Sequence, residues 1–303
     1  MFAPGLGFMT DLVAFFRDVE NAAFWSRLAP WLRVDRLSSD DRVRRPPAPP
    51  PDLAGTWPRD GYVRAEGLLT DAEAGALAQA VSALRAHEVH PTFVYVYDET
   101  WKVADSLRLW LAGALGYDVE LLADVWAWHV DPAKDRGGWP IHRGWYEDVH
   151  DPTGAPTLLN VWVSLSDATV RNACIHIVPL PRDPHYPHDL NNLESLERSG
   201  VSLPTRAGTA LLWSANAAHW GGICDPLCTD PRISMSFTVR RGSGPRLDVP
   251  VVDGALSFRD RLDLIADQFL RYGSRELARG RHEMRWAALV SAMRTAASQG
   301  ARR

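Results

Sequence analysis

Residues 137–148 read Gly-Gly-Trp-Pro-Ile-His-Arg-Gly-Trp-Tyr-Glu-Asp. This stretch holds the first of two histidines on which the interpretation of the chain depends. A second segment, residues 218–222, reads Ala-His-Trp-Gly-Gly and lies far downstream. The two segments supply His142 and His219. Neutral imidazole is a good ligand for iron(II), and oxygen-activating iron sites commonly combine two histidines and one carboxylate on a single face of the metal. The two histidines therefore predict one shared metal site.

The order of these motifs resembles that of the iron(II)/2-oxoglutarate oxygenases of the phytanoyl-CoA dioxygenase-like group. In that group a His-x-Asp pair ends one strand and a second His lies on a later strand. An Arg about a dozen residues further on binds the distal carboxylate of 2-oxoglutarate. His142, His219 and Arg232 match these three roles. The resemblance implies an enzyme with iron(II), 2-oxoglutarate and O2 as cofactors.

Gly144 stands where the His-x-Asp pair has its carboxylate. In the group that this chain resembles, glycine or alanine at that position marks the halogenating branch. The chemical reason is that removing a negatively charged ligand opens a position on iron, which a halide can fill. The resemblance therefore implies chloride as a further cofactor and Gly144 as the open halide position.

The resemblance runs from about Asp60 to about Arg241 and implies a mainly β core, a double-stranded β-helix or jelly roll, with flanking helices. Residues 61–70 predict a short strand that ends in a helix N-cap, and residues 71–87 predict an amphipathic helix. Period-two alternation of apolar residues predicts further strands at residues 92–97, 120–130, 158–165, 210–214 and 233–240. A second helix is predicted over residues 106–115.

Three segments are predicted to form one compact domain. Residues 1–59 hold helices and a basic, proline-rich linker that cannot form a helix or a central strand. Residues 60–250 form the catalytic core. Residues 251–303 are helical and charged, and they are candidates either to buttress the core or to form a homodimer contact.

Composition limits the kinds of partner. The chain has 303 residues, of which 46% are hydrophobic, and its formal net charge is −4, so no overall field favours a nucleic-acid polymer or a membrane surface. The three cysteines form no repeated framework, which favours a reducing compartment. Residues 1–9 lack the basic and apolar regions of a signal peptide. We expect a soluble, cytoplasmic protein that acts on a small molecule.

Further site residues are expected around the histidines. Asn160 and Trp162, which share one face of the predicted strand at residues 158–165, are candidates to contact 2-oxoglutarate. Further candidates are Ser234, on the polar side of the strand after Arg232, and Thr209, at the turn into the strand that leads to His219. A second set is expected to orient halide, water or substrate: Arg143, Trp145 and Asp148 next to the first histidine, and Trp128 and His129 on the strand before it.

Three functions remain open from the sequence. The first is a halogenase that chlorinates an unactivated C–H bond of a free-standing, amino-acid-like or nucleotide-like substrate; the abundance of tryptophan would suit stacking on such a molecule. The second is a hydroxylase of the same fold, in which Glu147, Asp148 or water replaces the third ligand, or in which Gly144 is itself a substitution. The third is a binding protein that kept the barrel without catalysis.

Overall fold

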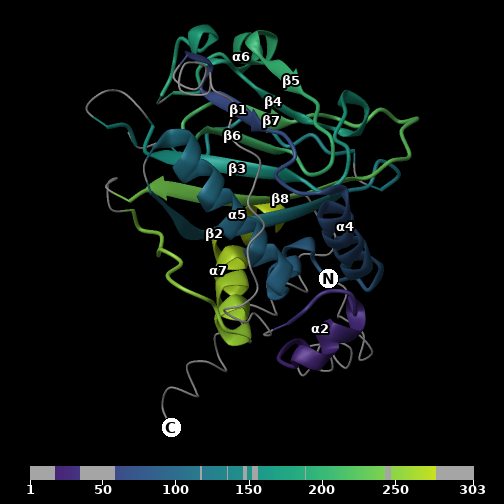
Figure 1. Ribbon diagram of the computed structural model, residues 1–303. Coiled ribbons are helices and arrows are strands. Elements are labelled where there is room, and N and C mark those ends of the chain that lie inside the picture. The colour runs from purple at the N-terminus through teal and green to yellow at the C-terminus, as the bar shows by residue number, and fades with distance from the viewer. Residues whose placement is uncertain are drawn as a thin grey trace, which may run out of the picture.

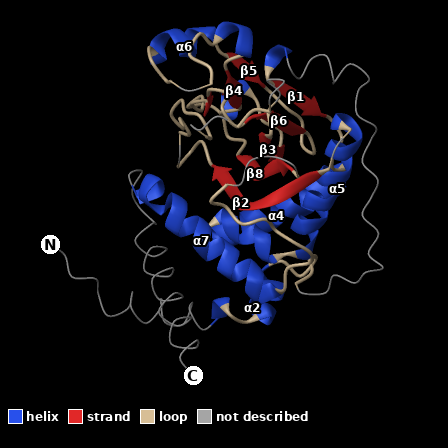
Figure 2. Ribbon diagram, turned by 90° about the vertical axis from the view of Figure 1, so that its left-hand side faces the viewer, coloured by secondary structure: helices blue, strands red, loops and turns tan. Residues whose placement is uncertain are grey.

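The computed structural model describes residues 18–34, 59–116, 118–134, 136–145, 149–151, 156–187, 189–242 and 247–277. Within these ranges two antiparallel sheets pack against each other, and helices cover the far side of the larger sheet (Figure 1; Figure 2). This arrangement confirms the predicted mainly β core with flanking helices.

The larger sheet has the strand order β1-β6-β3-β8-β2. Its strands are β1 (Tyr62–Ala65), β2 (Val119–Val130), β3 (Leu158–Ser164), β6 (Ala210–Ser214) and β8 (Arg232–Arg241). Directly opposed residues of antiparallel neighbours point to the same side of a sheet. The register therefore assigns one face, which we call the inner face, to Trp126, Trp128, Asn160, Trp162, Leu211, Trp213, Ser234, Ser236 and Thr238.

The opposite face of this sheet is aliphatic, and Val161, Leu212 and Met235 are fully buried there. It packs against α4 (Asp71–Ala86), α5 (Asp98–Leu115) and α7 (Phe258–Leu277), with α2 (Ala22–Leu28) behind them (Figure 2). Burial of this apolar surface stabilises the fold at about 25 cal/mol per Å² removed from water. Because the helices cover the aliphatic face, the aromatic and polar inner face is the one that can form a binding site.

The smaller sheet has the order β5-β4-β7, with β4 (Ile175–Ile177), β5 (Val201–Leu203) and β7 (His219–Gly221). Its apolar residues Ile175, Ile177 and Leu203 pack on Trp162 and Trp213 of the inner face. A 3-10 helix, η2 (Val170–Asn172), precedes β4, and the segment that joins β4 to β5 carries η3 (Leu180–Arg182) and α6 (Leu193–Ser199). His219 therefore reaches the inner face from the smaller sheet.

The predicted helices are observed where they can be compared. Helix α4 begins at Asp71 with the capping box that the sequence indicates: Glu73 N donates to Thr70 Oγ1 (3.2 Å), and Thr70 N donates to Glu73 Oε2 (2.7 Å). Helix α5 starts earlier than predicted. The helical predictions for residues 10–17 and 278–298 lie outside the described residues. None of the helices in the described ranges is long and apolar enough to cross a membrane.

The strand predicted at residues 92–97 is wrong. Pro91–Val96 instead form a 3-10 helix, η1, whose six residues are all buried. Proline at its first position fixes a helical φ angle and lacks the N–H that a helix start leaves unpaired. Alternation of large residues indicates a strand only when one face is exposed, and here helices and sheet enclose the segment on every side.

Helix α7 is fixed to this assembly by buried polar contacts. Arg261 Nη1 donates to Asp98 Oδ1 (2.5 Å) and to the carbonyl oxygen of Val96 (2.9 Å). Gln268 donates to the carbonyl oxygen of Ala123 (3.0 Å), next to the register shift in β2. The helix thereby places Tyr272 against Trp126, at one end of the inner face.

Candidate functional site

The two predicted histidine ligands come together in the fold. His142 and His219 form an isolated antiparallel bridge, in which the N–H of each donates to the carbonyl oxygen of the other (3.0 and 2.9 Å). Their ring centroids are 4.2 Å apart. Segments separated by most of the β core are thus joined backbone to backbone, which holds both imidazoles at one point.

Both imidazoles are oriented in the same way. His142 Nδ1 lies 2.9 Å from the carbonyl oxygen of Pro140, and His219 Nδ1 lies 2.9 Å from that of Ala217. A carbonyl only accepts, so each Nδ1 carries the proton and each Nε2 carries the lone pair that a metal needs. Burial, together with the neighbouring His142, lowers the pKa of His219 well below its ordinary value. His219 is therefore neutral at neutral pH, as a metal ligand must be.

Gly144 lies beside the pair, with the side chain of Asn160 next to it. A Cβ atom added at Gly144 would overlap Asn160 Nδ2 and lie 3.2 Å from the carbonyl oxygen of Ala215. Within the described ranges no cluster of three or more His, Cys, Asp or Glu side chains can hold a metal ion. The cysteines described in this structure, Cys174, Cys224 and Cys228, are free and buried. Glu147 and Asp148, which the sequence left open as a third ligand, lie outside the described residues.

A cavity of about 140 Å³ opens between the two sheets at this point. It is lined largely by tryptophan, with the histidines, Gly144, Arg232 and several polar residues of the inner face. The lining residues are Asp124, Val125, Trp126, Trp128, Trp139, His142, Gly144, Asn160, Val161, Trp162, Ile175, Trp213, His219, Trp220, Gly221, Arg232, Ser236, Phe237, Thr238 and Tyr272. The aromatic side chains make much of the surface in front of the histidines apolar.

Arg232 lies in the same cavity, as its position after His219 predicts. It is 5% exposed, and its guanidinium lies 5.7 Å from the ring centroid of Trp162. On β8 it precedes Ser234, which faces Trp128 across the register. A buried guanidinium over an aromatic ring, in the wall of an aromatic cavity, suits a carboxylate that accepts two parallel hydrogen bonds.

Donors without acceptors mark the same region. Trp162 Nε1, Trp213 Nε1 and Ser234 Oγ are buried, and none has a hydrogen-bond partner among the described residues. Leaving a buried donor unpaired costs about 1–3 kcal/mol, so such groups usually indicate a missing ligand or water. Two histidines whose Nδ1 atoms face carbonyl oxygens, a buried arginine and the unpaired indole donors of Trp162 and Trp213 line one cavity, and this set fits iron(II) with a dicarboxylate such as 2-oxoglutarate.

Replacing Arg232 by lysine is expected to weaken binding of 2-oxoglutarate about tenfold or more, since lysine keeps the charge but lacks the planar pair of donors. Titration of the metal-loaded protein with 2-oxoglutarate under anaerobic conditions would measure this. Arg206→Lys is the control, because Arg206 is exposed and lies outside the cavity. Equal affinities for the wild type and Arg232→Lys would contradict the assignment.

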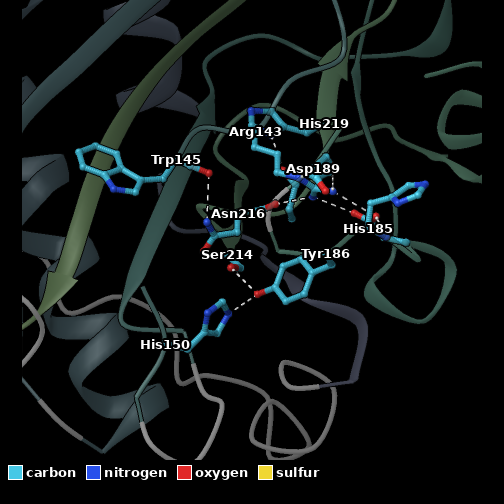
Figure 3. Close-up of polar contacts among 11 residues, drawn as sticks. Arg143, Trp145, His150, His185, Tyr186, Asp189, Ser214, Asn216 and His219 are labelled. Carbon is cyan, nitrogen blue, oxygen red and sulfur yellow. Dashed lines mark hydrogen bonds and ion pairs between the residues drawn. The ribbon is translucent and has the colours of Figure 1, made fainter. Parts of the chain in front are cut away.

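Arg143 is placed differently from the prediction. Its guanidinium is buried and donates to both carboxylate oxygens of Asp183 (2.8 and 3.1 Å), to the Asn216 carbonyl (2.6 Å) and to the Asp189 carbonyl (2.7 Å). Figure 3 shows it between the His219 segment and the loop that carries Asp189. Arg143 therefore ties three segments together instead of facing halide or substrate.

Other predicted site residues are also corrected. Trp145 does not line the cavity: its backbone O accepts from Asn216 Nδ2 (3.0 Å), while its ring points away from the cluster and packs near Leu158 and Val249 (Figure 3). His129 lies on the face of β2 opposite Trp128, where burial and Arg85 lower its pKa.

Thr209 lines a separate hollow with Asp167 and Arg206, so it is not placed to contact a ligand of the histidine pair. Asp148, with Glu147, lies outside the described residues. Of the expected contacts, Trp128, Asn160 and Trp162 do line the cavity with His142 and His219.

Two polar groups were not anticipated from the sequence. Asp124, which also lines the cavity, accepts hydrogen bonds from Thr238 Oγ1 (2.7 Å) and from Tyr272 OH (2.5 Å). Below the Arg143 cluster, the Tyr186 hydroxyl contacts His150 Nε2 and shares a hydrogen bond with Ser214 Oγ (3.0 Å; Figure 3). Each group joins distant segments, so no local pattern in the chain indicates it.

Comparison with protein-family models gives no match, and comparison with curated proteins gives none either. Solved structures are similar. The carbocyclase SnoK from nogalamycin biosynthesis, described as non-heme and alpha-ketoglutarate-dependent, superposes with a TM-score of 0.53 at 12% identity, covering 69% of this chain and 97% of SnoK. AviO1 from Streptomyces viridochromogenes Tue57 gives 0.52 at 16% identity, covering 69% and 99%.

The epimerase SnoN, solved with Fe3+, alpha-ketoglutarate and nogalamycin RO, gives a TM-score of 0.50 at 22% identity, covering 63% of this chain and 83% of SnoN. At such identities the likeness establishes the fold. The chain therefore has the jelly-roll fold shared by these non-heme, alpha-ketoglutarate-dependent enzymes.

Proposed function

We propose that this protein is an iron(II)- and 2-oxoglutarate-dependent enzyme that oxidises a C–H bond of a small molecule, and that it transfers chloride in place of hydroxyl. One observation carries the proposal: His142 and His219, with their Nε2 lone pairs available by tautomer, share a cavity with buried Arg232, while glycine stands two residues after the first histidine. The similarity of the fold to that of enzymes named for the same cofactors supports the class.

The bound cofactors would supply the oxidation itself, consuming O2 and converting 2-oxoglutarate to succinate and CO2. The protein's residues bind and orient. His142 and His219 would hold the metal, and the carbonyls of Pro140 and Ala217 fix their ring orientation. Arg232 would hold the far carboxylate of 2-oxoglutarate over Trp162.

Indole rings form part of the cavity wall in front of the histidines. Trp220 is fixed by stacking on His176 at 5.2 Å, and Trp213 contacts the ring of His219 at 4.8 Å. Rigid walls of this kind hold a flat or apolar substrate in one orientation, which decides which C–H bond reacts. The same walls suit the amino-acid-like or nucleotide-like substrates expected from the sequence.

Hydroxylation by the same site is the second candidate. It is favoured by the name of one similar structure, a non-heme monooxygenase. The two outcomes differ in what occupies the position beside Gly144, a halide or an oxygen ligand.

The test needs no substrate. Apoprotein is titrated anaerobically with iron(II) and 2-oxoglutarate, and their visible charge-transfer band is followed with and without chloride. We expect a band that shifts or tightens with chloride. A band indifferent to chloride would support the hydroxylase instead, and no band at all would leave a binding protein.

Installing a carboxylate at Gly144 is expected to raise iron(II) affinity on the order of tenfold, because it adds a third protein ligand. Asn160 must first move, since a Cβ at Gly144 overlaps its amide. We therefore expect Gly144→Asp alone to show little gain and the double variant with Asn160→Ser to show it in full.

Equilibrium dialysis of the metal measures both affinities, with Asn160→Ser alone as the matched control. If the two Asp-containing variants bind iron equally well, Asn160 is not the obstacle. If neither exceeds its parent, the position two residues after His142 does not face the metal.

A further inference from the structure

We propose that Asn160 and Trp213 are the hydrogen-bond donors of a site for one small monovalent anion, a halide, beside Gly144. The inference rests on the proposed function, because the anion would lie next to the metal held by the two histidines. It adds what Gly144 alone cannot supply. A glycine leaves room, whereas an anion withdrawn from water needs donors that replace its hydration.

The placement of the two side chains follows from the sheet register. Asn160 on β3 and Trp213 on β6 are directly opposed and share the inner face. Asn160 Nδ2 occupies the space that a side chain at Gly144 would enter, and the Trp213 ring lies 4.8 Å from that of His219. The amide and the indole thus border the open position from neighbouring strands, with a histidine at its edge.

Both groups are suited to an acceptor. The indole Nε1–H only donates, it is buried, and Trp213 is 3% exposed with no partner for this nitrogen in the described part of the chain. The Asn160 amide offers two further N–H donors, and its side chain makes no hydrogen bond with another described residue. Asn160 and Trp213 donate from neutral groups on two rigid strands. Such donors suit a small anion with a single charge, such as a halide. A larger oxyanion usually binds to arginine or lysine side chains instead.

The residues of the inner face next to Asn160 and Trp213 are suited to a different ligand. Ser236 and Trp162 are opposed one step along the strands, and Arg232 lies beyond them. That end offers a guanidinium, which suits the carboxylate of 2-oxoglutarate. The cavity would therefore hold the 2-oxoglutarate carboxylate at the charged donor, Arg232, and the halide at the neutral donors, Asn160 and Trp213.

The experiment uses the full chain with iron(II) and 2-oxoglutarate, without oxygen, titrated with sodium chloride and separately with sodium bromide. The readout is the halide concentration that half-saturates the change in the charge-transfer band. Trp213→Phe keeps the ring and removes the N–H, Asn160→Leu removes the amide, and Asn160→Asp keeps the size but replaces donors by negative charge. Trp31→Phe is the indole control, because Trp31 is exposed and bonded to the Ala76 carbonyl oxygen far from the cavity.

We expect Trp213→Phe and Asn160→Leu to keep the iron and 2-oxoglutarate band while the half-saturating chloride concentration rises about tenfold or more, the usual effect of losing a hydrogen bond to a charged group. Asn160→Asp should abolish the chloride response, and Trp31→Phe should match the wild type. Bromide-soaked crystals should show an anomalous peak within hydrogen-bond distance of Asn160 Nδ2 and Trp213 Nε1.

Other results would overturn the inference. If Asn160→Leu and Asn160→Asp lose the band itself, Asn160 binds the metal or 2-oxoglutarate and not the anion. If the wild type gives a band without a halide response, the anion site is absent while the proposed cofactor dependence survives. If the wild type gives no band, the proposed function itself has failed.

Discussion

Replacement of His219 by alanine is expected to lower the affinity for iron(II) by more than about a hundredfold, and turnover should fall with it. The loss of a residue that merely orients a metal ligand typically costs 10–100-fold. Losing one of two histidine ligands should exceed that, because within the described ranges no third His, Cys, Asp or Glu side chain joins the pair. Anaerobic equilibrium dialysis with iron(II), or with cobalt(II) as a spectroscopic substitute, would measure the affinity.

His129→Gln is the matched control, because the structure places this histidine on the face of β2 opposite Trp128 and outside the cavity. It should bind metal like the wild type. Equal losses in both variants would indicate a general effect on folding. An unchanged affinity in His219→Ala would show that the metal, if bound, lies elsewhere.

Replacement of Arg143 by methionine is expected to lower the free energy of unfolding by about 3–5 kcal/mol, the usual result of removing one partner of a buried ion pair. The side chains of Arg143 and Asp183 are both fully buried. Without the guanidinium, the Asp183 carboxylate and the carbonyl of Asn216 would keep no charged donor in their place. Chemical denaturation followed by circular dichroism would give the difference.

The same variant is also expected to weaken metal binding, because Arg143 follows His142 and holds the turn that leads to His219. Arg171→Met is the control: its ion pair with Asp225 is exposed to solvent, at 62% and 37%, so its loss should leave both properties close to those of the wild type. If Arg143→Met unfolds like the wild type, the cluster contributes no net stability, and a direct role of Arg143 toward ligand would have to be reconsidered.

The alternating residues of β2 could be assigned to two faces from the sequence, but not to the cavity. The pattern correctly separates Trp128 from His129 by face, yet it does not say which face meets the cavity. That choice depends on where the helices pack, and α4, α5 and α7 cover the aliphatic side. The strand prediction at residues 92–97 is wrong for a related reason: all six residues of the 3-10 helix Pro91–Val96 are buried, so alternation there does not separate a buried from an exposed face.

The residues beside a motif are the hardest to assign. Arg143 and Trp145 flank Gly144 in the sequence. The guanidinium of Arg143, however, donates its hydrogen bonds to Asp183 and two carbonyl oxygens, and the Trp145 ring packs against a separate apolar cluster. Thr209 precedes the strand to His219 and still lies in a different hollow. Adjacency in sequence fixes position to within a few ångströms, whereas the direction of a side chain is fixed by partners from distant segments.

The amino-acid sequence sufficed to predict the mainly β fold with flanking helices, and to select His142, Gly144, His219 and Arg232 as a candidate site, which the structure brings into one cavity. These features are carried by residue type and by spacing along a strand, which are local properties of the chain. Folding in three dimensions settled what depends on the register between strands: the placement of Asn160 against Gly144, the pairing of Asn160 with Trp213, and the burial of Arg143. Register and burial are set by contacts between segments far apart in the chain. The side chains that surround Gly144 are therefore determined only when the two sheets pack together.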